Sequence, residues 1–267
     1  MDEGSGGGFA WTVVAVRQRL ARGMLGAVLN AVLPRGCAGC DMPDMVLCPS
    51  CEASFARPRC YALGGVEMDF GYACAAYRGA ARQAVLAWKD HGDEECTPMF
   101  AQALAALALR VGIRESVRGR EILIVPTPSS SRSVRRRGRW HMLPLARRLA
   151  RLLRESGVNA RVAPVLTMRG VARKSVEMRG SSQRAGRVGG HIVMRRGADV
   201  EGSLVMLVDD IVTTGSTMRQ CVGVLGSGGA IVLTALALAQ AGESQRNPGR
   251  QPAVRRGDGL PVGESCP

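Results

Sequence analysis

The chain has 267 residues, of which 46% are hydrophobic and 22% charged, as is typical of globular proteins. No apolar stretch reaches the roughly 18 residues of a membrane span, and the acidic, glycine-rich start lacks the pattern of a secretory signal, so we expect a cytoplasmic protein without a membrane span. The formal net charge of +14 favours a polyanionic partner such as nucleic acid. Almost all of this charge is arginine, which a GC-rich coding sequence produces equally well, and aromatic residues, at 4%, are too few for a base-stacking surface.

Apolar residues recur at every fourth position within residues 13–33, with arginines between them, and Pro34 follows. This period predicts an amphipathic helix that ends before the proline. We expect the helix to pack on the body of the protein. The alternative is a helix on a membrane surface, but its polar face is short and its basic cluster is small. Residues 1–34 are therefore predicted to be a glycine-rich start followed by this helix.

Four cysteines form two Cys-x-x-Cys pairs, Cys37 with Cys40 and Cys48 with Cys51, separated by seven residues. Four thiolates favour Zn²⁺ in a reducing compartment, whereas disulfides or redox chemistry would fit an oxidising one. Four thiolates leave no open coordination position, so a zinc ion here would be structural. The pattern predicts a small zinc ribbon over residues 35–66.

From residue 67 onwards, strand and helix patterns alternate. Strands are expected at residues 72–77, 121–126, 162–166, 191–194, 203–208 and 230–238, and helices at residues 80–89, 98–110, 142–155 and 217–225. Because the longer strands are apolar on both faces, they predict an α/β domain over residues 67–240, with a parallel sheet covered by helices on both sides. Residues 169–190 are expected to form a long mobile loop, and residues 241–267 a disordered tail.

Two adjacent acids, Asp209 and Asp210, follow the most apolar strand. Ligands of open parallel sheets bind beyond the carboxyl ends of the strands, where ribose hydroxyls or a divalent cation would satisfy two carboxylates. A turn rich in hydroxyl groups comes next and leads into a helix, whose N-terminus attracts phosphate. The turn consists of Thr213, Thr214, Gly215, Ser216 and Thr217, and Val212 directly before it is expected to bind the ligand with them. Together these features predict a ribose 5-phosphate pocket; the alternative, an acidic pair that only caps a helix, needs one side chain and no glycine turn.

This stretch resembles the signature of the type I phosphoribosyltransferases, while the glycine-rich motifs of other nucleotide-binding folds are absent. The order of the cysteine cluster, "AYRGAARQAVLAWKDHGD", "VPTPSSSRSVRRRG" and the acidic stretch resembles that of ComF proteins, which are competence-associated relatives with an N-terminal zinc ribbon. The resemblance implies a type I phosphoribosyltransferase fold, phosphoribosyl diphosphate with Mg²⁺ as the ligand, and Asp209 and Asp210 as catalytic residues.

Four positions depart from the pattern of many ComF relatives. Leu63 stands where a second Cys-x-x-Cys pair would be completed after Cys60. Arg139 and Trp140 follow Arg137 and Gly138 in place of Phe and Asn, and Arg187 replaces an Asn. These departures leave the acceptor substrate unassigned.

Several residues are expected to meet the diphosphate of the ligand. Pro128 and Ser129 follow a buried strand and belong to the same sheet edge as the acidic pair. Lys89 and Arg137 lie in the ComF-like segments and are expected to contact phosphate, whereas the neighbouring arginines 132, 135 and 136 are expected to form a solvated face. His91 is either an acid or base or an exposed loop residue, and neither His141 nor His191 has an evident partner. The loop at residues 169–190 is predicted to close over the site.

Two functions fit these features. The first is an enzyme that transfers or hydrolyses the phosphoribosyl group, with an unknown acceptor. The second is a non-catalytic adapter in DNA uptake that uses the same fold to bind single-stranded DNA beside a helicase-like translocase of the competence system.

Overall fold

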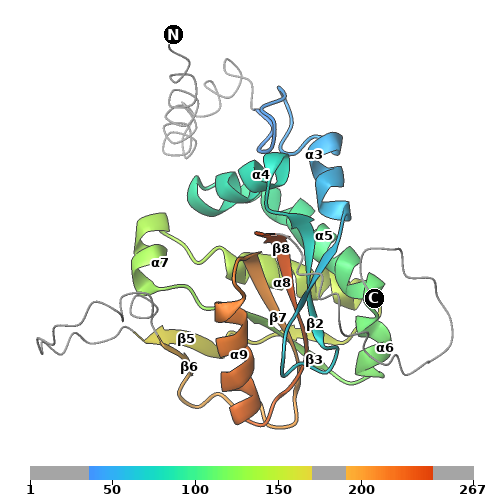
Figure 1. Cartoon of the computed structure of the whole chain (residues 1–267), viewed down its shortest axis with the longest axis vertical. Coiled ribbons are helices and arrows are strands. Elements are labelled where there is room, and N and C mark those ends of the chain that lie inside the picture. The colour runs from blue at the N-terminus through green and yellow to red at the C-terminus, as the bar shows by residue number, and fades with distance from the viewer. Residues whose placement is uncertain (1–35, 170–190, 243–267) are drawn as a thin grey trace, which may run out of the picture.

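The computed structural model describes residues 36–169 and 191–242 (Figure 1). The helices, with two 3-10 turns η, are α3 (Pro49–Ala53), η1 (Ser54–Ala56), α4 (Gly79–Asp90), η2 (Glu94–Cys96), α5 (Thr97–Arg110), α6 (Ile113–Val117), α7 (Ser131–Arg137), α8 (Met142–Glu155) and α9 (Ser216–Ser227). The strands are β1 (Arg59–Ala62), β2 (Phe70–Ala76), β3 (Ile122–Pro126), β4 (Ala160–Val162), β5 (Leu166–Arg169), β6 (His191–Met194), β7 (Leu204–Val212) and β8 (Ile231–Gln240). The predicted N-terminal helix, the loop after Arg169 and the C-terminal tail lie outside the described residues.

A six-stranded sheet forms the centre of the described fold, in the order β1-β2-β8-β7-β3-β4. Strands β2, β8, β7, β3 and β4 run parallel, and β1 joins the edge antiparallel to β2. Strands β5 and β6 form a separate antiparallel pair. The predicted α/β architecture with a largely parallel sheet is therefore confirmed.

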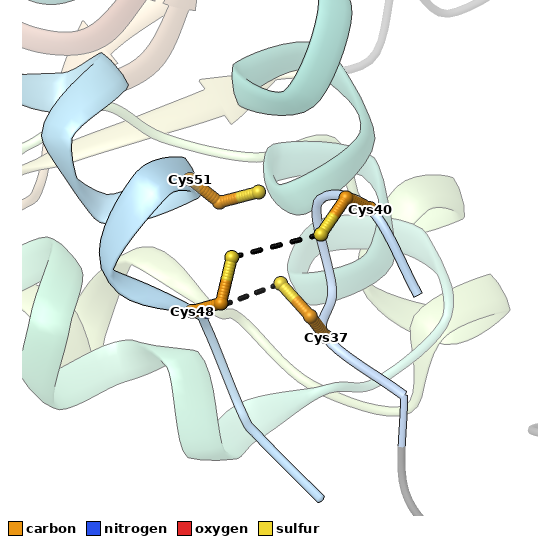
Figure 2. A group of neighbouring side chains, drawn as sticks. All are labelled: Cys37, Cys40, Cys48 and Cys51. Atoms are coloured by element: carbon orange, nitrogen blue, oxygen red, sulfur yellow. Dashed lines mark hydrogen bonds between the residues drawn. The ribbon is translucent and has the colours of Figure 1, made fainter. Parts of the chain in front are cut away.

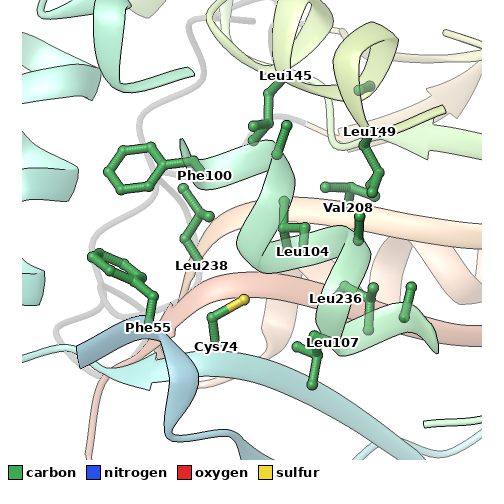
Figure 3. Packing of buried hydrophobic residues seen from close by; sticks show 14 of the residues in the cluster. Phe55, Cys74, Phe100, Leu104, Leu107, Leu145, Leu149, Val208, Leu236 and Leu238 are labelled. Atoms are coloured by element: carbon green, nitrogen blue, oxygen red, sulfur yellow. The ribbon is translucent and has the colours of Figure 1, made fainter. Parts of the chain in front are cut away.

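Helices cover both faces of this sheet. On the face that we call the α8 face, α4, α5 and α8 pack on the sheet, with Phe100, Leu104 and Leu149 fully buried (Figure 3). On the opposite α9 face, α9 and the β5–β6 pair cover the sheet. Strand β7 contributes side chains to the hydrophobic core on both faces, because alternate side chains of a strand point to opposite faces. Val208 packs in the core on the α8 face and Leu207 in the core on the α9 face.

The predicted helices at residues 80–89, 98–110 and 142–155 agree with α4, α5 and α8 to within a residue at each end. The strand predicted at residues 162–166 is wrong, because β4 ends at Val162 and β5 begins at Leu166. Pro164 lies between them and has no N–H with which to continue a ladder. The strand predicted at residues 203–208 extends instead to Val212, so it includes both aspartates.

The cysteine segment is joined closely to this fold. Strand β1 lies within the range predicted for the zinc ribbon, yet it is an edge strand of the main sheet. Phe55 of η1 packs against Phe100 of α5, with ring centroids 5.1 Å apart. The domain limits at residues 35, 66 and 240 remain predictions. In the described part of the chain, no helix combines the length and the apolar character that crossing a membrane requires.

Candidate active site

The two aspartates lie within β7 and therefore face opposite sides of the sheet. Asp210 is directed to the α8 face, where it contacts Lys89 at the end of α4 and His141 before α8. Asp209 is directed to the α9 face, where its negative charge acts on Cys221 of α9. The extension of β7 past the predicted strand end thus separates the two carboxylates that the sequence places side by side.

Asp210 is a buried carboxylate with two protein partners. Lys89 Nζ lies 2.9 Å from both carboxylate oxygens, and His141 Nε2 lies 2.6 Å from Oδ2. Burial alone would raise the pKa of Asp210, but the hydrogen bond from His141 and the charge of Lys89 lower this pKa to about 2. The carboxylate is therefore held ionised, while burial lowers the pKa of His141.

Asp209 has different surroundings. Its Oδ1 accepts hydrogen bonds from Thr127 Oγ1, at 2.7 Å, and from the backbone N–H of Asp210, at 2.9 Å. Burial, and then the charge of Asp210, raise the pKa of Asp209 to about 7. Both of its hydrogen bonds within the described residues use Oδ1, so Oδ2 of this half-buried side chain is left for a ligand.

The turn after β7 presents hydroxyl and backbone N–H groups to solvent. Gly215 precedes α9 with φ of 71°, a left-handed conformation that glycine adopts without strain. As glycine it has no side chain to cap the helix, and the N–H of Ser216 donates to Thr214 Oγ1 at 3.4 Å. Thr214 Oγ1 and Ser216 Oγ lie 3.2 Å apart, and Thr213 and Thr217 are exposed beside them. Val212 differs from these residues, since its side chain is buried and only its backbone borders the turn. The turn has the geometry of an anion site at a helix N-terminus.

The segment after β3 borders the same edge of the sheet, because Pro126 pairs with Val208 of β7. Thr127 continues this pairing through its N–H, which donates to the carbonyl of Val208 at 2.9 Å. Pro128 is buried and Ser129 is half-buried, so the structure brings both to the edge that carries Asp209, as predicted from the sequence.

The basic residues at the end of α7 and just after it contact acids at the end of α4 and in η2. Arg136 and Arg137 lie 3.2 Å and 3.4 Å from Asp90, and Arg139 lies 3.3 Å from Glu94. The Arg137 side chain is only 7% exposed, and its Nε has no hydrogen-bond partner among the described residues. The arginines at 136 and 137 are thus held by an acid, and phosphate contact by Arg137 stays a prediction.

Two residues at this site were not singled out from the sequence. His141 is 69 positions from Asp210, and no local pattern in the sequence connects them. Thr127 belongs to the segment "VPTPSSS", from which the sequence predicts Pro128 and Ser129 as ligand contacts. The position of Thr127 at the end of a strand is the only feature of the sequence that indicates a role for it. Residues 170–190 of the loop that is predicted to close over the site lie outside the described part of the chain.

The four cysteine sulfurs form a second centre, near the start of α4. All lie within 4.8 Å of one another, and the sulfurs of Cys40 and Cys48 are 3.6 Å apart (Figure 2). Tetrahedral zinc sites place their sulfurs about 3.8 Å apart. The N–H groups of Gly39 and Cys48 donate to Cys37 Sγ and, against the effect of burial, lower the pKa of Cys37 to about 7. The cluster can therefore hold a zinc ion.

This cluster packs directly on α4. A Cβ at Gly39 would lie 2.7 Å from Cys51 Sγ and 3.2 Å from the carbonyl oxygen of Ala80, so only glycine fits between them. Helix α4 begins there and carries Lys89 in its last turn. The cysteine cluster and the acidic strand are thus connected by one helix. Cys74 and Cys221, which lie outside this cluster, are fully buried.

Residues 142–255 match the family described as the phosphoribosyl transferase domain. No curated protein matches the chain at a significant level. Similar solved structures include hypoxanthine phosphoribosyltransferase from Staphylococcus aureus (18% identity, TM-score 0.33, covering 55% of this chain and 64% of that one). Orotate phosphoribosyltransferase from Aeropyrum pernix is another (17% identity, TM-score 0.32, covering 61% of this chain and 66% of that one). Adenine phosphoribosyltransferase from Leishmania donovani is also similar (14% identity, TM-score 0.29, covering 55% of this chain and 72% of that one). The chain spans just under two thirds of the first two proteins.

The largely parallel sheet and the family match over residues 142–255 together support a phosphoribosyltransferase-type domain. In this chain the four-cysteine cluster precedes the matched residues.

Proposed function

We propose that this protein binds phosphoribosyl diphosphate with Mg²⁺ and transfers or hydrolyses its phosphoribosyl group. One observation carries the proposal: Asp209 Oδ2, which accepts no hydrogen bond from the described residues, lies one short turn away from the exposed hydroxyl groups before α9. A ribose 5-phosphate needs both an acceptor for its hydroxyls and a cradle for its phosphate. The acceptor of the phosphoribosyl group stays open.

Each part of the site has a role in this proposal. Asp209 accepts from the ribose hydroxyls, and the turn at residues 213–217 binds the 5-phosphate. Lys89 and the segment at Pro128 and Ser129 face the diphosphate, and Arg137 contributes positive charge from α7. Carboxylate oxygens suit Mg²⁺, so Asp209 and the ligand's own phosphates would hold this ion. When bound, Mg²⁺ neutralises charge that develops on the departing diphosphate.

We further propose that the four-cysteine cluster holds a structural zinc ion. Four sulfurs at tetrahedral spacing, with backbone N–H groups that donate to one of them, support this assignment. The cluster then fixes the start of α4. The succession of cysteine cluster, α4 segment and acidic strand also supports a ComF-like protein.

The alternative function, an adapter in DNA uptake, is not favoured by a specific observation. Single-stranded DNA requires a groove of available cations. Within the described residues, arginines at several positions pair with acids, as Arg136 does with Asp90 and Arg161 with Glu121. Binding of single-stranded DNA and of a competence translocase therefore becomes an outcome of the test.

Calorimetric titration with phosphoribosyl diphosphate and Mg²⁺ tests the proposal. We expect the wild type to bind and Asp209→Asn to lose most of its affinity, whereas Glu155→Gln, at an exposed carboxylate on α8, should bind like the wild type. A parallel titration with single-stranded DNA covers the alternative. Binding of DNA alone, with a steep dependence on salt, would replace the enzyme by the adapter.

A further inference from the structure

The two adjacent aspartates differ in how much of each carboxylate the protein itself occupies. Asp210 is 5% exposed, and both of its oxygens have protein donors, Lys89 and His141. Asp209 is less buried, and its protein donors in the described part of the chain converge on Oδ1. A ligand that approaches this strand end therefore meets one aspartate with a free oxygen and one whose oxygens are already bound.

His141 is held in place on all sides. Its side chain is 1% exposed, and its ring packs edge-on against Trp88, with centroids 4.8 Å apart. Trp88 is itself fixed, since its Nε1 donates to Thr97 Oγ1 at 2.9 Å and its carbonyl accepts from Arg139. The imidazole therefore cannot turn away from Asp210 unless the contact between α4 and the start of α8 opens.

The hydrogen-bond roles follow from the partner. An ionised Asp210 can only accept, so His141 Nε2 carries the proton and Nδ1 is the bare nitrogen. In agreement, Nδ1 is buried without a hydrogen-bond partner among the described residues. An unprotonated ring nitrogen without a donor is less costly to bury than an N–H group would be.

We propose that His141 is a positioning residue: it fixes Asp210, and through Asp210 the ammonium group of Lys89, so that Asp209 alone of the acidic pair meets the ligand. This inference rests on the proposed function. It assigns ligand binding to Asp209 and makes Asp210 an internal anchor, that is, the buried carboxylate that holds Lys89 in place. The Lys89 side chain is 24% exposed. An ammonium group has three donors, so contacts with the two oxygens of Asp210 leave one for a phosphate oxygen.

Affinity measurements on folded variants test the positioning role. Dissociation constants for phosphoribosyl diphosphate with Mg²⁺ are compared by calorimetry well below the melting temperature of each variant. Because hydrogen bonds to a charged group are lost, Asp209→Asn should raise the constant about 10- to 100-fold, and His141→Ala, which frees Asp210 and Lys89, about tenfold. In His141→Gln the amide N–H replaces Nε2–H, so the constant should return to within about threefold of the wild type.

A purely structural role would change stability but not the affinity of the folded protein. Wild-type affinity in His141→Ala, or equal affinities in the Ala and Gln variants, would overturn the positioning role. Since a group left unpaired inside the protein is costly, Asp210→Asn and His141→Ala should lower the melting temperature by about 5 °C or more, whereas Asp209→Asn should leave it unchanged or raise it.

The melting temperatures also separate the two proposals. If the wild type does not bind phosphoribosyl diphosphate, the proposed function fails, but the order of melting temperatures still tests the internal anchor. Equal melting temperatures for Asp209→Asn and Asp210→Asn would contradict the division of roles, whatever the ligand.

Discussion

At the scale of single residues, the acidic pair shows how two neighbouring carboxylates coexist. Asp210 is stabilised as an anion by Lys89 and His141, and its charge in turn adds to the burial that makes Asp209 harder to ionise. Like charges one residue apart thus have opposite pKa shifts. The pair is prepared for a ligand that supplies positive charge or hydroxyl donors to Asp209.

The opposite shifts predict opposite contributions to the pH dependence of stability. The pKa of Asp210 is lowered to about 2, so its contribution is present above the ordinary value of 3.8 and is lost as the pH falls through that range to 2. The pKa of Asp209 is raised to about 7, so its contribution is present below pH 3.8 and is lost as the pH rises to 7.

Urea unfolding in magnesium-free buffer measures the second of these effects. Between pH 4 and 7, the free energy of unfolding of the wild type should fall relative to that of Asp209→Asn, because only the wild type must ionise a buried carboxylate. A difference between the two proteins that stays constant over this range would contradict the raised pKa of Asp209.

At the scale of elements, the turn between β7 and α9 depends on one backbone conformation. Gly215 has φ of 71°, and Gly197, in the turn after β6, has φ of 75° with no atom near the position of a Cβ. The backbone strain of an alanine is therefore similar at both glycines, and a Cβ at Gly215 would in addition lie 3.2 Å from Nη1 at the end of the Arg219 side chain. Only Gly215 lies at the proposed phosphate cradle.

Gly215→Ala and Gly197→Ala form a matched pair of variants. Each should lower the free energy of unfolding by about 1 kcal/mol, since alanine tolerates a positive φ poorly. Only Gly215→Ala should weaken binding of phosphoribosyl diphosphate in calorimetry. Equal affinities of the two variants would show that the phosphate binds elsewhere.

Helix α4 connects the cysteine cluster to Lys89, and the cluster is therefore expected to stabilise the helix start. Cys40 is the exposed member of the cluster, so its replacement removes a ligand with little change in packing. Cys40→Ser should lose the zinc ion, of which the wild type is expected to hold about one per chain, and amide exchange in α3 and at the start of α4 should accelerate.

Met45→Ala is the control for this variant, because Met45 is 40% exposed in the loop between the two cysteine pairs and is not a ligand. This variant should keep both the zinc ion and the slow amide exchange of α3 and the start of α4. Metal analysis that finds no zinc in the wild type, or unchanged exchange in Cys40→Ser, would remove the structural role from the cluster.

At the scale of the whole molecule, local patterns predicted most of the fold. Apolar strands that alternate with helices gave the parallel sheet, because that pattern depends on burial alone. The extension of β7 is not predicted, because two adjacent aspartates are typical of a loop. In the structure, β8 pairs with β7 as far as Val212 and so holds both aspartates in the strand. The partnership of His141 with Asp210 could not be predicted, because the fold creates it between distant segments.

The central claim concerns one place in the molecule, the end of β7 between Asp209 and the turn at residues 213–217. A crystal structure with phosphoribosyl diphosphate and Mg²⁺ tests it most directly. The account predicts the 5-phosphate at the turn before α9 and the ribose hydroxyls at Asp209 Oδ2, with Asp210 still bound to Lys89 and His141. A ligand bound elsewhere, or Asp209 Oδ2 and the turn occupied by the protein's own side chains in the presence of saturating ligand, would contradict it.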